Sequence, residues 1–393
     1  MADTWFDETL YPFYRQGIRV DGVLYRGQTK FQSVEIISNE RLGRVLCLDG
    51  VVQTTEGDEF YYHESMTHPA MFAHGRVESV LIVGGADGGI LREVLRHPVK
   101  EVVIVDIDGE LIDICRAHLP LHHAGAFEDP RTVNLPGDGA AYVAETDKRF
   151  DVILVDSTDP QGPGIVLFQA PFFRNCLRVL KKGGLMVTQN GVSYYQPDEL
   201  REAHHHRLQV FKKAGAYLSP IPAYVGGHMA FGWASQSLDL PNVPGATIRR
   251  RLTASGIETR HYNPEVHAAF FALPNNIRPL IAEGHEEGRT GLKQLWAGLA
   301  DQPGPKRAAP KAVTPKKAPK AKKAPKAKAA SPKPAKAAKV AKPAKRLLKR
   351  PAKRKAAAIK ASKPKAAAAK GKARKVIKAA RKAPKKAARR AKR

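Results

Sequence analysis

The last quarter of the chain cannot build a hydrophobic core. Residues 301–393 hold 37 of the 66 Lys and Arg residues of this 393-residue sequence, and one of its 37 acids. From residue 303 onward Lys, Ala and Pro dominate, and no aromatic side chain occurs. A segment with so little apolar surface cannot offset the conformational entropy that folding removes. We therefore predict that residues 299–393 form a disordered basic tail.

Charge divides the sequence into two regions. The whole chain carries a formal net charge of +29, and the segment 301–393 carries +36, which leaves −7 for residues 1–300. A tail with so many cations is expected to bind nucleic acid by neutralising phosphates and releasing counterions. DNA, RNA and polyphosphate are all candidate partners, and a solubilising segment without a partner is the alternative. A membrane surface is disfavoured because the tail has no apolar face.

The remaining composition points to a cytoplasmic protein. Cys47, Cys115 and Cys176 are far apart and form no C-x-x-C pair, so neither a disulfide framework nor a zinc site is indicated. The first ten residues lack the basic and apolar regions of a secretory signal. No apolar stretch is long enough to span a membrane.

Two patterns predict two folded domains before the tail. Residues 1–75 alternate apolar and polar positions between Gly, Asn and Asp turns, which predicts a β-rich domain with strands at 19–25, 33–38, 43–48 and 51–55. Residues 76–298 alternate apolar runs with helix-length segments. The runs at 80–83, 102–105, 152–155 and 185–188, with helices at 90–97 and 172–180, predict an α/β domain with a doubly wound, mostly parallel sheet. Late strands are expected within 220–233.

A glycine-rich turn follows the first of these runs. Gly84, Gly85, Gly88 and Gly89 permit close approach of a nucleotide, and Asp106 ends the next strand, where a carboxylate can bind ribose hydroxyls. The alternative for Asp106 is a helix cap. Asp87 inside the turn would repel a pyrophosphate, so it indicates a ligand with a cationic group, unless it only interacts with the helix dipole.

A second acidic loop follows the run at 152–155. Asp156 and Asp159 lie three residues apart in the string DSTDPQGPG, at the carboxyl end of a predicted strand, where open α/β sheets bind ligands. A magnesium site or a plain turn are alternatives, but no Lys that could cradle a phosphate accompanies the pair. His204, His205 and His206 also suggest a metal, although a solvated helix face is the favoured interpretation.

With these residues in hand, the sequence resembles the spermidine synthase family of polyamine aminopropyltransferases over residues 5–280. The most specific stretches are LDGVVQTTEGDEFYYH at 48–63, GGADGGILRE at 84–93 and DSTDPQGPG at 156–164. Shorter matches are QNG at 189–191, IPAY at 221–224 and YNP at 262–264. The resemblance implies a small N-terminal β domain, a Rossmann-like, methyltransferase-type catalytic domain and a homodimer or homotetramer. The tail resembles linker-histone and bacterial histone-like tails in composition only.

The resemblance also implies a reaction and a set of site residues. The donor would be decarboxylated S-adenosylmethionine, a co-substrate, and the acceptor putrescine, with no cofactor and no metal. Asp156 would be the catalytic proton acceptor, Asp159 would bind the far ammonium of the diamine, and Asp87 would bind the amine of the donor. Asp106 would bind the ribose, and Asp138 and Gly139 would lie against the adenine. The other matching pocket positions are Gln32, Tyr62, His63, Pro163 and Tyr224, with Gln53 and Gln189 as weaker candidates.

Two positions depart from the family pattern. Ala86 stands where a third glycine is common, and Asp106 stands where Glu is frequent. We expect both to be tolerated.

The residues themselves favour aminopropyl transfer over methyl transfer. An alkylamine with a pKa of roughly 10 must lose a proton before it attacks, and a nearby carboxylate can accept that proton. Intact S-adenosylmethionine carries a carboxylate that Asp87 would repel. Two further alternatives remain, namely another acceptor (cadaverine or spermidine) and a nucleic-acid architectural protein with an inactive enzyme-like domain.

Overall fold

The computed structural model describes residues 4–8, 10–159 and 162–282, with the side chains of 162 and 163 excepted. The predicted tail, 299–393, lies outside the described residues, and so does the end of the predicted catalytic domain. Within the described part of the chain, no helix is both long and apolar enough to cross a membrane.

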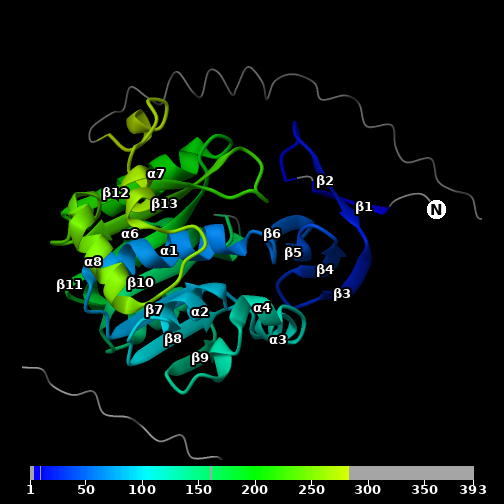
Figure 1. Cartoon of the computed structure of the whole chain (residues 1–393), viewed down its shortest axis with the longest axis horizontal. Coiled ribbons are helices and arrows are strands. Elements are labelled where there is room, and N and C mark those ends of the chain that lie inside the picture. Colours follow the sequence, from blue (N-terminus) through cyan, green and yellow to red (C-terminus); the bar gives the residue numbers. More distant parts are fainter. Residues whose placement is uncertain (1–3, 9, 160–161, 283–393) are drawn as a thin grey trace, which may run out of the picture. The chain divides into compact units, whose positions relative to one another are not determined.

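The N-terminal strands form two small antiparallel sheets, which lie to one side of the larger sheet (Figure 1). One sheet pairs β1 (Thr4–Glu8) with β2 (Gln16–Val20). The other contains, in spatial order, β3 (Gly22–Gln28), β4 (Ser33–Asn39), β5 (Gly43–Leu48) and β6 (Val51–Thr55). The predicted ranges of β5 and β6 are confirmed. The single strand predicted at 19–25 is wrong, because the chain bends at Asp21, whose carboxylate accepts hydrogen bonds from the Arg19 side chain and the Glu40 backbone.

The larger sheet is the predicted doubly wound α/β sheet. It contains β7 (Ser79–Gly84), β8 (Glu101–Asp106), β9 (Thr132–Pro136), β10 (Phe150–Asp156), β11 (Leu180–Val192), β12 (Lys213–Pro220) and β13 (His228–Ser235). Their spatial order is β12-β13-β11-β10-β7-β8-β9. Five neighbouring strands run parallel, from β11 to β9, whereas β13 is antiparallel to both β11 and β12.

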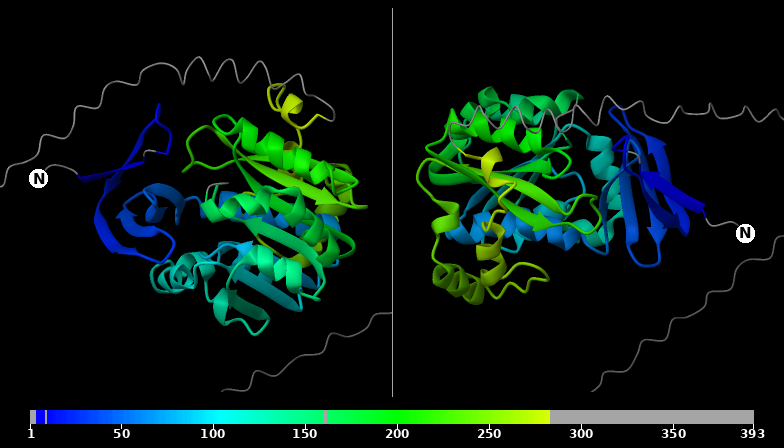
Figure 2. Two further views of the ribbon diagram at one scale, coloured as in Figure 1. Left: turned by 180° about the vertical axis from the view of Figure 1, so that it is seen from behind. Right: turned by 90° about the horizontal axis from the view of Figure 1, so that it is seen from above.

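Helices cover both faces of this sheet (Figure 2). They are α1 (Glu59–His74), α2 (Gly89–Leu95), α3 (Gly109–His118), α4 (Pro120–His123), α5 (Gly139–Glu145), α6 (Ala170–Val179), α7 (Pro197–Leu208), α8 (Gly245–Ser255) and α9 (Pro264–Phe270). Short 3-10 helices occur at Ala126–Glu128, Gly162–Phe168, Leu240–Asn242 and Arg278–Leu280.

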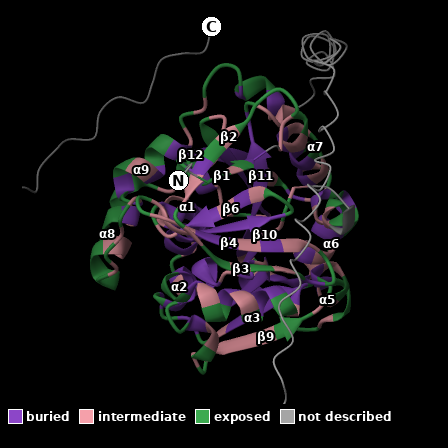
Figure 3. Cartoon of the chain, turned by 90° about the vertical axis from the view of Figure 1, so that its right-hand side faces the viewer, coloured by how far each residue is buried: buried purple, intermediate pink, exposed green. Residues whose placement is uncertain are grey.

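Alternation along each strand assigns side chains to the two faces. In β7, Val80 and Ile82 join the apolar cluster of α1 and α2, whereas Leu81 and Val83 join the cluster of α5 and α6. Both sets are almost inaccessible to solvent, and Figure 3 shows this buried layer running through the strands. The strands of the larger sheet are therefore continuous apolar runs, which explains why they could be located from the sequence.

One helix that lies inside the predicted N-terminal domain packs against the larger sheet. Met66 and Ala70 of α1 belong to the same buried cluster as the β7 residues Val80 and Ile82. The helix also carries a buried acid, Glu64, whose carboxylate accepts hydrogen bonds from three consecutive backbone N–H groups at residues 260–262. This helix therefore ties the N-terminal strands to the body of the catalytic domain.

The histidine run on α7 is only partly exposed. His205 faces solvent, but His204 is buried and the Nδ1 atom of His206 lies 2.9 Å from the carbonyl oxygen of Phe168. The expected solvated face is thus wrong for His204, because consecutive helical residues point about 100° apart and three of them do not share one face. Among the described residues, no group of three His, Cys, Asp or Glu side chains could hold a metal ion.

The parallel strands β7 and β10 end side by side, and Gly84 allows their close contact. Its φ is +84°, and a Cβ atom there would lie 1.9 Å from the carbonyl oxygen of Asp156. We predict that Gly84→Ala lowers the free energy of unfolding by at least about 2 kcal/mol, measured by chemical denaturation. Gly245→Ala is the matched control, because nothing lies within 4 Å of its added methyl group. Equal stability of the two variants would contradict this account.

Candidate active site

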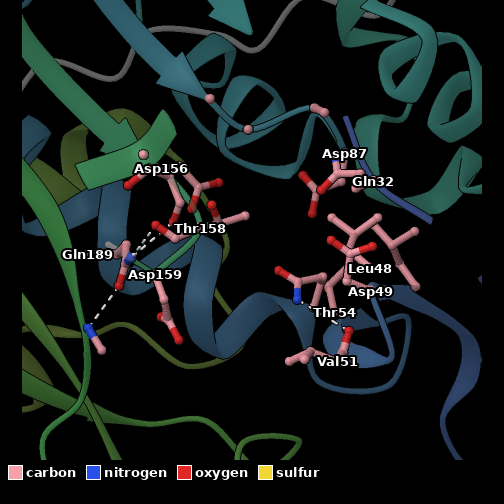
Figure 4. Close-up of a pocket in the computed structure, with 18 of the residues that line it drawn as sticks. Gln32, Leu48, Asp49, Val51, Thr54, Asp87, Asp156, Thr158, Asp159 and Gln189 are labelled. Atoms are coloured by element: carbon pink, nitrogen blue, oxygen red, sulfur yellow. Dashed lines mark hydrogen bonds between the residues drawn. The ribbon is translucent and has the colours of Figure 1, made fainter. Parts of the chain in front are cut away.

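A cavity of about 570 Å³ opens at the carboxyl edge of β7, β8 and β10, and strands β5 and β6 contribute to its other wall. Of the predicted site residues, all but one line it: Gln32, Gln53, Tyr62, His63, Asp87, Asp106, Asp138, Gly139, Asp156, Asp159, Gln189 and Tyr224. The side chain of Pro163 lies outside the described residues. Figure 4 shows Asp156 and Asp159 on one side of this cavity and Asp87 with Gln32 on another. The fold thus brings together residues that are up to 192 positions apart in the chain, from Gln32 to Tyr224.

Asp87 is held by two contacts at the glycine-rich turn. The backbone N–H of Gly89 donates to its Oδ1 atom over 2.7 Å, and the Nε2 atom of His63 lies 3.2 Å from its Oδ2 atom. Although burial acts the other way, the neighbouring His63 imidazolium keeps the pKa of Asp87 well below its usual range. The carboxylate is therefore a fixed anion beside the cavity.

Asp106 does not cap the helix that follows it. The cap of α3 is Asp108, whose side chain accepts a hydrogen bond from the backbone of Leu111. Asp106 instead accepts the N–H of Asp108 through Oδ1, and burial raises its pKa to about 6. The alternative interpretation of Asp106 as a cap is thus wrong, and its carboxylate lines the cavity.

Three more predicted residues line the same cavity. Asp138 caps α5, accepting hydrogen bonds from the backbone of Ala140 and Ala141. Gly139 lies where a Cβ atom would come within 2.5 Å of Val83. Gln32 donates to Oδ2 of Asp108 over 3.0 Å, which joins the N-terminal sheet to the β8 loop. Ala86 has an ordinary negative φ, so the methyl group that replaces a family glycine causes no backbone strain.

Asp156 ends β10 and accepts a hydrogen bond from the Tyr62 hydroxyl, with 2.6 Å between Oη and Oδ1. Burial, and the nearby anion Asp87, raise the pKa of Asp156 to about 7. Burial also raises the pKa of Asp159, whose Oδ2 atom accepts a hydrogen bond from Gln196 over 2.7 Å. In the described structure, neither carboxylate forms a salt bridge with Lys or Arg. The cavity thus presents two carboxylates with pKa values raised by burial.

The weaker candidates hold the loops in place. Gln189 donates to the carbonyl oxygens of Ser157 and Thr158 (Figure 4), which fixes the backbone between Asp156 and Asp159. The backbone carbonyl of Gln53 accepts the hydroxyl of Tyr224 over 2.6 Å. The Tyr224 and Tyr62 rings lie 6.2 Å apart, edge to face, and form an aromatic wall. Such a wall suits a cationic alkyl chain.

Three contributors to the site escaped the sequence analysis. Glu59 contacts His63, Asp108 contacts Gln32, and Gln196 contacts Asp159. Only Glu59 could have been found from the sequence, because it lies four positions before His63 and residues four apart on a helix are neighbours. Gln196 precedes α7 and lies 37 positions from Asp159, so no local pattern links them.

Comparisons with known proteins agree with this geometry. A family model described as the spermine/spermidine synthase domain matches residues 59–243, and one described as the spermidine synthase tetramerisation domain matches residues 4–56. The polyamine aminopropyltransferase of Serratia proteamaculans is 48% identical over 276 residues, which cover 70% of this chain and 96% of that protein. The chain belongs to the spermidine synthase family.

Other members of the spermidine synthase family are similar in sequence and in structure. Polyamine aminopropyltransferase 1 of Pseudomonas aeruginosa is 46% identical over 279 residues, covering 71% of this chain and 98% of that protein. A crystal structure of spermidine synthase in complex with the transition state analogue AdoDATO matches with a TM-score of 0.67 and 35% identity, over 71% of this chain and 94% of that one. Spermidine synthase from Thermotoga maritima matches with a TM-score of 0.65 and 33% identity, at the same coverage. The predicted family, its fold and its class of enzyme, an aminopropyltransferase, are confirmed.

The raised pKa of Asp156 predicts a stability effect with a definite sign. Between its ordinary pKa of 3.8 and about 7, the folded protein retains a proton that the unfolded chain has released, so stability falls as pH rises through this window. Each unit of pKa difference is worth about 1.4 kcal/mol. We expect Asp156→Asn to raise the free energy of unfolding by at least about 1 kcal/mol at pH 8, and by less at pH 5.

Asp151, on the same strand, provides the matched control. Although burial acts the other way, backbone N–H donors and Lys181 lower its pKa, so Asp151→Asn should be destabilising at pH 8. Denaturant titrations at pH 5 and pH 8 measure both variants. An Asp156→Asn protein less stable than the wild type at pH 8 would refute the raised pKa.

Proposed function

We propose that this protein is a spermidine synthase, which transfers the aminopropyl group of decarboxylated S-adenosylmethionine to putrescine and releases methylthioadenosine. The observation that carries the proposal is the set of anions in one cavity. Asp156 and Asp159 form no salt bridge with Lys or Arg among the described residues, and Asp87 lies across the same cavity. The ammonium groups of a diamine and of a donor with a terminal ammonium are suited to these anions.

In this proposal Asp156 accepts the proton of the attacking amine. A base with a pKa near the working pH combines the right protonation state with a useful driving force. The pKa of Asp156, raised to about 7, meets that condition. The nitrogen lone pair attacks the carbon next to the sulfonium, the carbon–sulfur bond breaks, and the thioether leaves with the bonding electrons. The sulfonium is already activated, so the proposed reaction uses neither a cofactor nor a metal.

The remaining residues position the two substrates. Asp159, oriented by Gln196, would bind the far ammonium, with Tyr62 and Tyr224 along the alkyl chain. At the donor end, Asp87 would bind the ammonium of the aminopropyl arm and Asp106 the ribose hydroxyls. Asp138, Gly139, Gln32 and Pro163 are proposed to enclose the nucleoside. Holding the two reactants in line supplies much of the rate acceleration.

The acidic donor end also separates this proposal from methyl transfer. Intact S-adenosylmethionine would place a carboxylate beside Asp87, which the hydrogen bond from Gly89 and the charge of His63 keep ionised. Cadaverine and spermidine remain alternative acceptors, because they differ from putrescine only in length. Because residues 4–56 are similar to a tetramerisation domain, we propose that the protein forms a homo-oligomer, either a dimer or a tetramer. We also propose that it is located in the cytoplasm.

A product assay tests the proposed reaction. The purified protein receives decarboxylated S-adenosylmethionine with putrescine, cadaverine or spermidine, and the amine products and methylthioadenosine are quantified by mass spectrometry. We expect spermidine from putrescine, and a loss of at least about 100-fold in kcat for Asp156→Asn. Asp151→Asn serves as a control on the same strand, outside the cavity lining. Methyl transfer from intact S-adenosylmethionine, without aminopropyl transfer, would exclude the proposal.

The composition of residues 301–393 supports a second function, binding of nucleic acid. Their +36 charge is sufficient for salt-dependent, sequence-independent attachment to phosphates. The lack of aromatic residues argues against base stacking. We propose that the tail tethers the enzyme to DNA or RNA, and so associates it with the nucleoid.

Removal of residues 302–393 separates the two functions. We expect turnover to be unchanged, because every described cavity residue lies before residue 230. Retention on double-stranded DNA at 50 mM salt should be abolished, and the full chain should lose affinity steeply as salt increases. Electrophoretic mobility shifts over a salt series measure this. If the truncated chain retains DNA binding, the tail is not the binding segment; if turnover is lost, the tail belongs to the enzyme's fold.

A further inference from the structure

We propose that Glu59 is a positioning residue, which acts through His63 to fix the charge and orientation of the Asp87 carboxylate at the donor end of the cavity. The inference rests on the proposed function, in which Asp87 binds the ammonium of the aminopropyl donor. It assigns a role to Glu59, which does not line the cavity, and changes the role expected for His63.

The contacts of His63 leave neither ring nitrogen free for a substrate. Its Nδ1 atom lies 2.6 Å from Oε2 of Glu59, one helical turn earlier on α1, and its Nε2 atom lies 3.2 Å from Oδ2 of Asp87. Only 2% of the His63 surface is accessible. While both contacts hold, neither ring nitrogen of His63 can form a hydrogen bond with a bound substrate.

The backbone at the start of α2 is built around this ring. A Cβ atom on Gly89 would lie 2.1 Å from Cε1 of His63, so only glycine leaves room for the imidazole. The same Gly89 donates its N–H to Oδ1 of Asp87 over 2.7 Å. Asp87 is thus bound at one oxygen by the backbone and at the other by His63, which fixes the plane of the carboxylate.

Glu59 is itself anchored by a cation. The Nη2 atom of Arg92 donates to Oε2 of Glu59 over 2.7 Å, and its Nη1 atom donates to two backbone carbonyls of the α4 segment. Arg92, Glu59, His63 and Asp87 therefore form a row of alternating charges. In a buried site of low dielectric, such neighbours hold each other in their charged forms.

Several other ionisable groups also face His63. They are His122, Asp58, Asp156 and, through Glu59, Arg92. Burial disfavours the imidazolium and lowers the pKa of His122 to about 4, so that ring is neutral. Against burial, Asp87 and Glu59 raise the pKa of His63 to about 10. His63 is therefore a cation throughout the neutral range, and Glu59 supplies part of that preference.

This row separates the titration of two carboxylates that share a cavity. Asp87 stays ionised in direct contact with the His63 cation, whereas the contact of Asp156 is the neutral Tyr62 hydroxyl, and burial and Asp87 outweigh the more distant His63 and raise the pKa of Asp156 to about 7. One carboxylate can then hold an ammonium at a pH where the other exchanges a proton. Without the row, Asp87 and Asp156 would compete for the same proton.

Glu59→Gln tests the role with almost no change in shape. The amide oxygen can still accept the Nδ1 proton, but it carries no charge, so the pKa of His63 should fall towards its ordinary value of about 6.5. A neutral His63 with its proton on Nδ1 presents the lone pair of Nε2 to Oδ2 of Asp87. The two groups then repel, and the donor's ammonium loses an oriented partner.

Steady-state kinetics of the full-length protein from pH 6 to pH 9 provide the first measurement. We expect the donor KM of Glu59→Gln to be about tenfold to 100-fold above that of the wild type at pH 8, as for loss of a charge-assisted hydrogen bond. The donor KM should increase with pH in the variant and should not depend on pH in the wild type. The acceptor KM should be nearly unchanged.

Glu93→Gln is the matched control. Like Glu59, Glu93 is buried, pairs with Arg92 and contacts a histidine, in this case His68 at 3.1 Å. It lies on α2, however, and in the described structure it has no contact with Asp87. We expect this variant to lower the melting temperature and to leave the donor KM independent of pH. A pH-dependent donor KM in Glu93→Gln as well would reduce Glu59 to a structural role.

Nitrogen-15 spectra of histidine-labelled protein give a readout that needs no turnover. The His63 signal, identified by its loss in His63→Gln, should show both nitrogens protonated at pH 8 in the wild type and only Nδ1 protonated in Glu59→Gln. A neutral His63 in the wild type, or parallel increases of donor and acceptor KM in the variant, would overturn the proposal. If the protein transfers no aminopropyl group yet shows these spectra, the charge row stands and the proposed function fails.

Discussion

The parallel pairing of β7 with β10 is the contact on which the site depends. Gly84 and Asp156 face each other at the ends of these strands, and the chain diverges there. The loop after β7 carries Asp87, and the loop after β10 carries Asp159. In an open α/β sheet a crevice forms where neighbouring strands send their connections to opposite sides. Two acidic loops from different parts of the sequence thereby border one cavity.

Helix α1 gives these two loops different chemical environments. Its consecutive residues Tyr62 and His63 contact Asp156 and Asp87, respectively. A neutral phenol that donates a hydrogen bond leaves the carboxylate of Asp156 able to take up a proton near neutral pH. A cationic imidazole keeps the carboxylate of Asp87 ionised. The different pKa values of the two aspartates thus depend on which neighbour each has, since the side chains themselves are identical, and the proposed roles of base and ammonium-binding group use this difference.

Much of the fold and of the site could be predicted from the sequence, for reasons that differ by element. The central strands of the larger sheet are buried on both faces, so they appear as apolar runs, and β7, β8 and β10 were located within one or two residues. The edge strands β1 and β9 are partly exposed and were missed, because they have no such run. The range 19–25 failed because a side-chain hydrogen bond at Asp21 bends the chain. The aspartates of the site were found because they follow strands directly, at positions where ligand-binding groups accumulate.

The sequence alone determined the central strands of the larger sheet, the family and the acidic residues that mark the cavity, because periodicity and local motifs depend on neighbours in the chain. It also separated the acidic body from the basic tail, since composition needs no coordinates. Only the tertiary structure decided which carboxylate has a pKa near neutrality and which stays a fixed anion. That difference arises from Glu59, His63 and Arg92 beside Asp87, and from Tyr62 beside Asp156. Such contacts join residues from 4 to 94 positions apart, and a pKa depends on those spatial neighbours and on burial.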